Sequence, residues 1–231
     1  MAEMALGYGS EFQLLRYLGH HRSYLNQKIR EVIGEGEISW LDFPVDLKRD
    51  SNDGEWKTIE CFSEMENFAE IKTKWGRFWP TSGNAHNWDG IFKHNNTWYF
   101  VEAKAHLEEA NQECEADSLT SIEMITRAFS KTCGSDELAE KWIKSKCYQL
   151  ANRLAFMHFC KEQGIPAKLL YISFLNGYEK YPKENVTDSS KWDSTWEKEM
   201  NTLQLSDELR QYIKMVTIDC HQPAEKEKYW D

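Results

Sequence analysis

Asp89, Glu102 and Lys104 have residue types and a spacing that suit metal-dependent chemistry, and they lie in one short stretch of the chain. If residues 95–96, an Asn-Asn pair, form the two-residue loop of a β-hairpin, Asp89 falls directly opposite Glu102. Directly opposed residues have Cβ atoms about 5 Å apart, which is close enough for two carboxylates to share one divalent cation. Strand alternation then places Lys104 on the face of Glu102 and turns Ala103 the other way. Because two unpaired carboxylates side by side destabilise a sheet, a bound metal ion would explain the arrangement.

This pattern resembles the PD-(D/E)XK nucleases, also called the restriction-endonuclease-like superfamily. In that family an Asp on one strand is followed by an apolar strand that ends in Glu-x-Lys. The matching residues here are Asp89, the run 98–101 (WYFV) and the segment 102–104 (EAK). Glu-x-Lys also occurs at 55–57 and 70–72, but neither copy has both the apolar strand before it and the hairpin-aligned Asp.

A second local match lies near the N-terminus. Residues 7–11 (GYGSE) and the FQLLRYL that continues from them resemble the first helix of archaeal Holliday-junction resolvases. An early Glu on that helix joins the active site of the resolvases, and the matching residue here is Glu11. The two resemblances cover roughly residues 7–20 and 79–175.

The resemblance implies a metal-dependent nuclease that hydrolyses phosphodiester bonds, with DNA favoured over RNA as the substrate. Asp89 and Glu102 would bind Mg²⁺ or Mn²⁺ together with the main-chain carbonyl of Ala103, an oxygen set that hard cations prefer. Lys104 would orient the attacking water and offset charge at the phosphate. Glu11 would complete the metal shell, either as a direct ligand or through water.

Gln149 and His106 are candidates for the surroundings of this site. In some relatives a glutamine on the helix after the motif approaches the site, and Gln149 corresponds to it, although the tyrosine that normally accompanies it is not at the matching position. His106 would extend the strand face that carries Glu102 and Lys104. A lone histidine at such a place also suits a surface position.

Each candidate has a purely structural alternative. Asp89 could satisfy a turn at the end of a strand, and Glu11 is a favourable acid in the first turn of a helix. Glu102 and Lys104 could belong to an exposed cross-strand charge ladder. Against that ladder, the preceding run is apolar at every position, as in strands buried on both faces, where charged side chains need partners.

The net charge of −10 argues against a nucleic-acid-binding protein, because such proteins usually carry a basic footprint. A magnesium site needs several acids, however, and local fields matter more than the total charge. Basic residues also gather where a substrate could lie, namely Lys141, Lys144, Lys146 and Arg153 after the motif and Arg16, His20, His21 and Arg22 before it. The alternative is that these residues form solvated helix faces.

Two other functions therefore stay open. The negative charge motivates a nuclease-fold module without catalysis that binds nucleic acid or protein. A non-nuclease α/β protein, whose hairpin is merely structural, is the other. A homodimer is also left open, since many PD-(D/E)XK relatives act as dimers.

Composition limits the class of protein. With 231 residues and 41% hydrophobic content the chain can bury a substantial core, and one domain is favoured. No apolar run reaches the roughly 18 residues of a membrane helix, and the N-terminus lacks the features of a signal peptide, so no membrane partner is expected. Six cysteines never form a C-x-x-C pair, which indicates reduced thiols in a cytoplasmic protein rather than a zinc site.

The order of elements predicts a mixed α/β fold, and the resemblance implies a restriction-endonuclease-like central sheet flanked by helices, in one domain over residues 1–231. Helices are expected at 11–20 with Ser10 as N-cap, at 24–33 ended by Gly34, and at 118–131, 136–163, 191–203 and 206–212. Around 36–76 we expect an inserted strand pair, 38–47 and 55–62, joined by the turn-rich 49–54 and followed by a helix from Ser63.

The buried strand 167–175 follows the long helix, so it should return parallel to the motif strand, with 213–220 as a final strand. The long helix has an apolar stripe that would cover the sheet, formed by Leu150, Leu154, Met157 and Cys160. The tryptophans that flank the motif are expected in the core rather than on a base-stacking surface; they are Trp75, Trp79, Trp88 and Trp98.

Overall fold

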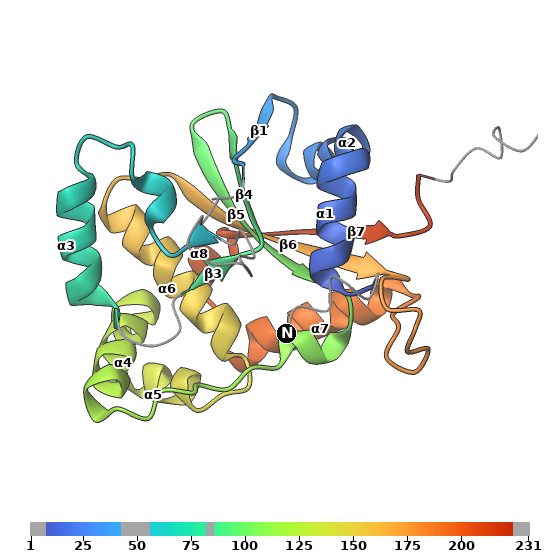
Figure 1. Ribbon diagram of the computed structural model, residues 1–231. Helices are drawn as coiled ribbons and strands as arrows, with labels where there is room; N and C mark the ends of the chain where they lie inside the picture. The colour runs from blue at the N-terminus through green and yellow to red at the C-terminus, as the bar shows by residue number, and fades with distance from the viewer. Residues whose placement is uncertain (1–7, 43–55, 82–85, 224–231) are drawn as a thin grey trace, which may run out of the picture.

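A five-stranded mixed sheet with the order β1-β4-β5-β6-β7 forms the centre of the protein (Figure 1). The computed structural model describes residues 8–42, 56–81 and 86–223. The strands of this sheet are β1 (Ile38–Trp40), β4 (Gly90–His94), β5 (Thr97–Lys104), β6 (Ala167–Leu175) and β7 (Ile213–Asp219). β1, β4 and β5 are antiparallel neighbours, whereas β5, β6 and β7 run parallel. The predicted mixed α/β class is confirmed.

The predicted hairpin forms between β4 and β5 in the predicted register. His94 pairs with Thr97, and the ladder continues to Gly90 opposite Val101. Asn95 adopts a φ of 53°, a left-handed conformation that asparagine tolerates better than most residues. The turn signal of the Asn pair and the apolar run that follows it are consistent with this register.

The predicted crossover also forms, because β6 lies parallel to β5. The connection consists of η3 (Leu107–Ala110), α4 (Leu119–Cys133), α5 (Asp136–Ile143) and α6 (Tyr148–Glu162). The single long helix expected at 136–163 is thus two helices. The break before α6 coincides with a bridge between Cys147 and Gln112, which takes the chain out of helical geometry.

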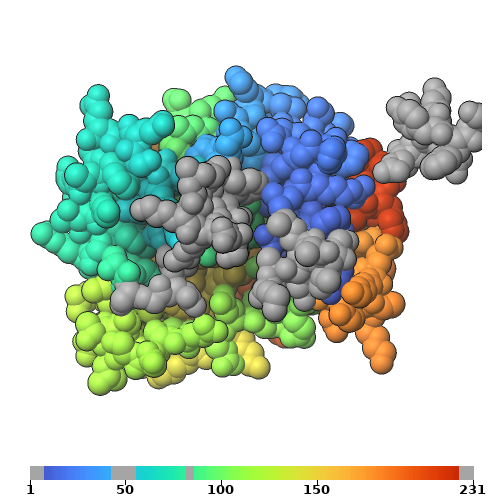
Figure 2. Space-filling view, viewed as in Figure 1, coloured from blue at the N-terminus to red at the C-terminus, as the bar shows by residue number. Residues whose placement is uncertain are grey.

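Helices cover both faces of the sheet (Figure 1). α1 (Ser10–His20) and α2 (Arg22–Ile33) pack on one face, where Val101 and Ala103 of β5 point toward Leu14 and Leu25 in one apolar cluster. The other face is covered by α3 (Phe68–Phe78), α4, α5, α6, α7 (Ser189–Thr202) and α8 (Asp207–Arg210). In the space-filling view α1 and α2 lie on one side of the molecule, and α3 and α4 lie on the other (Figure 2).

The second apolar cluster contains the expected core residues. Phe100 of β5 contacts Phe156 of α6 with ring centroids 4.8 Å apart. The predicted stripe of α6 is buried in this cluster, as are three of the four tryptophans, while Trp98 packs against it partly buried. These predictions are confirmed.

The region 36–76 differs from expectation. β1 joins the central sheet beside β4, whereas β2 (Trp56–Lys57) pairs with β3 (Asn87–Trp88) in a separate two-stranded sheet. Among the described residues of the two segments, the predicted pairing with each other is therefore wrong, because β1 pairs with β4 and β2 pairs with β3. The predicted turn 49–54 lies outside the described residues. The helix expected from Ser63 begins at Phe68, after the short 3-10 helix η2 (Glu60–Phe62).

Ser10 is not an N-cap, since Gly9 holds that position and the Ser10 hydroxyl donates to Glu109 Oε1 at 3.0 Å. Gly34 does end α2, as predicted. Within the described part of the chain, no helix is long and apolar enough to cross a membrane.

Candidate active site

Asp89 lies where the chain bends between β3 and β4, next to the end of β5. Its main-chain N–H donates to the carbonyl of Val101 at 3.1 Å, and its Oδ2 accepts from the N–H of Ala103 at 2.7 Å. The N–H and C=O of one strand residue point to the same edge of the strand, so the Ala103 carbonyl also faces the β4 side. The hairpin therefore brings the Asp89 carboxylate to the residue between Glu102 and Lys104.

Glu102 and Lys104 share the face of β5 that points toward α6 and α7, while Ala103 belongs to the apolar cluster under α1. Glu102 is 2% exposed and Lys104 is 6% exposed. The Lys104 Nζ lies 3.6 Å from Glu102 Oε2. An exposed cross-strand charge ladder is thus the wrong interpretation, because both charges lie inside the protein.

Arg153 of α6 is the partner that sequence analysis did not assign to Glu102. Its Nε donates to Glu102 Oε1 at 2.5 Å, and its guanidinium lies 4.6 Å from the ring centre of Trp88. Nη1 donates to Asn152 Oδ1 at 3.1 Å and Nη2 donates to the Asn87 carbonyl at 2.9 Å. Arg153 is 6% exposed, so neither a surface basic patch nor a solvated helix face describes it.

A signal for this pairing existed in the sequence. A glutamate that continues a strand buried on both faces needs a buried cation, and the crossover helix is the element that must cover that strand. Arg153 is the arginine on that helix.

The three lysines just before α6 do fit the solvated-face interpretation. Their exposed side chains form surface ion pairs, which are Lys141 with Glu137, Lys144 with Glu140, and Lys146 with Glu113.

Tyr171 of β6 and Glu199 of α7 complete the charged surroundings, and sequence analysis missed both. Tyr171 is paired in register with Glu102. Burial raises the pKa of the Tyr171 hydroxyl well above its usual value, and the charges of Glu102, Glu199 and Asp89 raise it further. Both candidate carboxylates therefore act on the same buried phenol.

Glu199 is 5% exposed, and its Oε1 has no hydrogen-bond partner among the described residues. Burial raises the pKa of the Glu199 carboxyl to about 8, although the Lys104 ammonium acts in the opposite direction.

Of the three remaining candidates, His106, Glu11 and Gln149, the first lies away from the strand face on which it was expected. His106 leaves the face of Glu102, because β5 ends at Lys104; its ring packs on Tyr178 at 4.5 Å and its Nε2 lies 3.6 Å from Glu109. That prediction is corrected.

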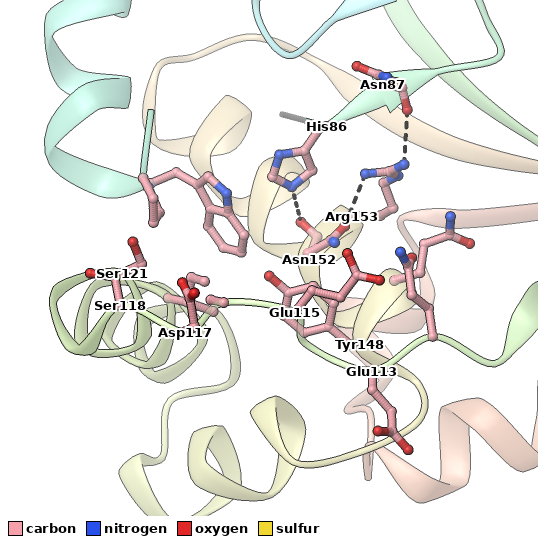
Figure 3. A pocket seen from close by; sticks show the side chains of 16 residues that line it. His86, Asn87, Glu113, Glu115, Asp117, Ser118, Ser121, Tyr148, Asn152 and Arg153 are labelled. Atoms are coloured by element: carbon pink, nitrogen blue, oxygen red, sulfur yellow. Dashed lines mark hydrogen bonds between the residues drawn. The ribbon is translucent and has the colours of Figure 1, made fainter. Parts of the chain in front are cut away.

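Glu11 occupies the first turn of α1, which packs on β5. Gln149 lines a cavity of about 560 Å³ beside Arg153 (Figure 3).

The donor atoms suit a hard cation in type. Asp89 and Glu102 offer carboxylate oxygens and Ala103 a carbonyl oxygen, the ligand chemistry that Mg²⁺ and Mn²⁺ accept when water fills the other positions. In the part of the chain that the structure describes, no three His, Cys, Asp or Glu side chains gather closely enough to hold a metal ion by themselves. Among the described residues, Glu11 therefore does not gather with Asp89 and Glu102 into such a group.

Comparisons with protein-family models, with curated proteins and with solved structures found no match to this chain.

Proposed function

We propose that this chain is a metal-dependent nuclease of the PD-(D/E)XK type, which hydrolyses phosphodiester bonds in DNA rather than RNA. One observation carries the proposal: the Asp89 carboxylate binds the main chain of Ala103, between the buried side chains of Glu102 and Lys104. We also propose that the sheet has the restriction-endonuclease-like fold, supported by an antiparallel hairpin whose second strand pairs in parallel after a helical crossover.

The roles follow from the positions of the side chains. Asp89, Glu102 and the Ala103 carbonyl would hold Mg²⁺ or Mn²⁺, which when bound activates water and stabilises charge on the phosphate. The Lys104 ammonium would orient the attacking water and offset the negative charge that develops on the phosphate. Because Lys104 is buried, its charge acts through a medium of low dielectric constant and has a stronger effect than it would in water.

One observation favours a second function, a nuclease-fold module that binds nucleic acid or protein without catalysis. Both oxygens of Glu102 already face cations, since Arg153 contacts Oε1 and Lys104 lies 3.6 Å from Oε2. A carboxylate held in this way is satisfied without a metal ion. In that case Asp89 would serve only to close the hairpin.

A cleavage assay separates the two functions. Duplex, branched and single-stranded DNA are incubated with the full chain in Mg²⁺ or Mn²⁺, with EDTA as the metal-free control. We expect cleavage that EDTA abolishes and that Lys104→Ala reduces at least about a hundredfold, whereas Lys141→Ala, at an exposed surface ion pair, leaves it unchanged.

Absence of cleavage on every substrate, together with no Mn²⁺ binding by calorimetry, would favour the binding module. If Lys104→Ala still cleaves DNA at the wild-type rate, this site is not where the reaction takes place.

A further inference from the structure

We propose that the cavity beside Arg153 accepts one unstacked nucleobase, so that the favoured substrate is DNA with an unpaired nucleotide next to the scissile phosphate. The inference rests on the proposed nuclease function and narrows its substrate class. The cavity has a volume of about 560 Å³, within the range of roughly 300–1,000 Å³ for small-ligand sites. It lies between α6, the start of α4, and the start of β3 with His86 directly before it (Figure 3).

Rings and side-chain amides line this cavity together. Tyr148 supplies a partly exposed ring, Gln112, Gln149 and Asn152 supply amides that can both donate and accept hydrogen bonds, and the buried rings of Trp79 and His86 belong to the wall of the cavity. Flipped bases are held by this combination, with stacking on the ring faces and hydrogen bonds to the base edge. Burial, with a smaller contribution from the Arg153 charge, lowers the pKa of His86 well below its usual value, so the imidazole is neutral at pH 7.

The charges at the cavity indicate which part of a nucleotide can enter. Glu113 and Asp117 lie on the side away from Asn87 and Arg153 (Figure 3), and Glu115 also lines the cavity. These carboxylates repel a phosphate but accept hydrogen bonds from an amino group. An uncharged group with exocyclic amino donors, such as adenine, cytosine or guanine, matches this lining, and the phosphate stays outside.

Arg153 connects the cavity to the candidate active site. Its side chain lines the cavity while its Nε contacts Glu102 Oε1 at 2.5 Å. Asn152, which also lines the cavity, accepts from Arg153 Nη1 at 3.1 Å. A base in the cavity is thus one arginine side chain away from the carboxylate, and it belongs to a nucleotide beside the bond to be cut.

A paired and stacked base cannot enter such a cavity without leaving the helix. Extrusion costs least for a mismatched, bulged or single-stranded base. The chain is therefore expected to bind DNA with an unpaired nucleotide more tightly than the same DNA fully paired.

The test uses the full chain and two matched DNA duplexes, one fully paired and one with a single bulged 2-aminopurine, in Ca²⁺ to permit binding. Fluorescence anisotropy gives the affinity, and 2-aminopurine emission reports the surroundings of the base. We expect tighter binding of the bulged duplex, by about 5- to 150-fold, which is what contacts to one base supply. We also expect a change in 2-aminopurine emission on binding.

Ser121→Trp places a large side chain in the cavity from α4 and should remove this preference while leaving the affinity for paired DNA unchanged. Ser194→Trp, at an exposed position on α7, is the matched control and should keep the preference. Equal affinities of the wild type for both duplexes, or a preference that survives in Ser121→Trp, overturn the proposal. Binding of a basic peptide that Ser121→Trp abolishes, without DNA binding, would also overturn it and assign the cavity to a cationic side chain.

Failure of the nuclease proposal gives a different result. If the chain cleaves all DNA structures without preference for an unpaired base, the nuclease proposal holds and the cavity does not recognise the substrate. If a base enters the cavity but no cleavage occurs in Mg²⁺ or Mn²⁺, the nuclease proposal is refuted and the cavity is still a base-binding site.

Discussion

The buried carboxyl of Glu199 makes the stability of the fold depend on pH. Its pKa is raised from 4.5 to about 8 by burial, so between these values the unfolded chain releases a proton that the folded chain keeps. One pKa unit corresponds to about 1.4 kcal/mol, so through this group the free energy of unfolding falls by roughly 5 kcal/mol in total as the pH rises from well below 4.5 to well above 8. The stabilising contribution is thus complete below about pH 4.5 and is lost as the pH rises toward 8. At pH 7 roughly 3 kcal/mol has been lost.

Glu199→Gln removes the titration with little change of shape. The free energy of unfolding is measured by urea unfolding at pH values from 4.5 to 8. Relative to the wild type, that of the variant should rise by about 3 kcal/mol between pH 4.5 and pH 7. Glu197→Gln, exposed on the same helix, should differ from the wild type by less than about 1 kcal/mol at every pH. If the difference in free energy of unfolding between the wild type and Glu199→Gln does not vary with pH, Glu199 is ionised in the folded protein over this range. That result would refute the reasoning.

Three further predictions concern the site and the core. The first is a double-mutant cycle measured by urea unfolding: Arg153→Met and Glu102→Gln should each lower the free energy of unfolding by about 3–5 kcal/mol, because each leaves a buried charge without its partner. The double variant should lose much less than the sum of the two single losses, and additive losses would contradict the pairing. Asp89→Asn keeps an acceptor for the Ala103 N–H, so the free energy of unfolding should change by less than about 1 kcal/mol. The affinity for Mn²⁺, measured by calorimetry, should fall, and an unchanged affinity would exclude Asp89 as a ligand. Phe156→Ala should destabilise the fold by about 3–5 kcal/mol in the same unfolding assay, and a cost below about 1 kcal/mol would contradict its place in the core.

Local signals were sufficient to predict the framework of the site. The Asn pair of the hairpin loop and the apolar run after it specify turn and register within a few residues, which is why Glu102 and Lys104 were placed on the correct face. The strand 167–175 was predicted with the bounds that the structure has, because a continuous apolar run bounded by Gly-Ile-Pro has few alternatives.

Partners across the fold could not be predicted in the same way. α6 is buried on nearly all sides, so its apolar stripe did not reveal that Asn152 and Arg153 also point inward. Glu199 lies on a helix rich in exposed polar residues, and only the tertiary packing of α7 under Lys104 buries it. The segments of β1 and β2 were recognised as strand-like, but short strands take their partners from the whole fold.

If the chain is the proposed nuclease, the charges at the site would explain how an acidic protein can bind the anionic backbone of DNA. Asp89 and Glu102 carry two negative charges, and Arg153 and Lys104 balance them with two positive ones. In the proposed nuclease, a divalent cation added to this balanced group leaves an excess of positive charge in a poorly solvated place, which is costly alone. A phosphate of the substrate supplies the missing negative charge, and Arg153 can then turn from Glu102 toward it, since guanidinium groups bind phosphate as well as carboxylate. Metal and DNA should therefore strengthen each other's binding, because each neutralises the charge that opposes the other.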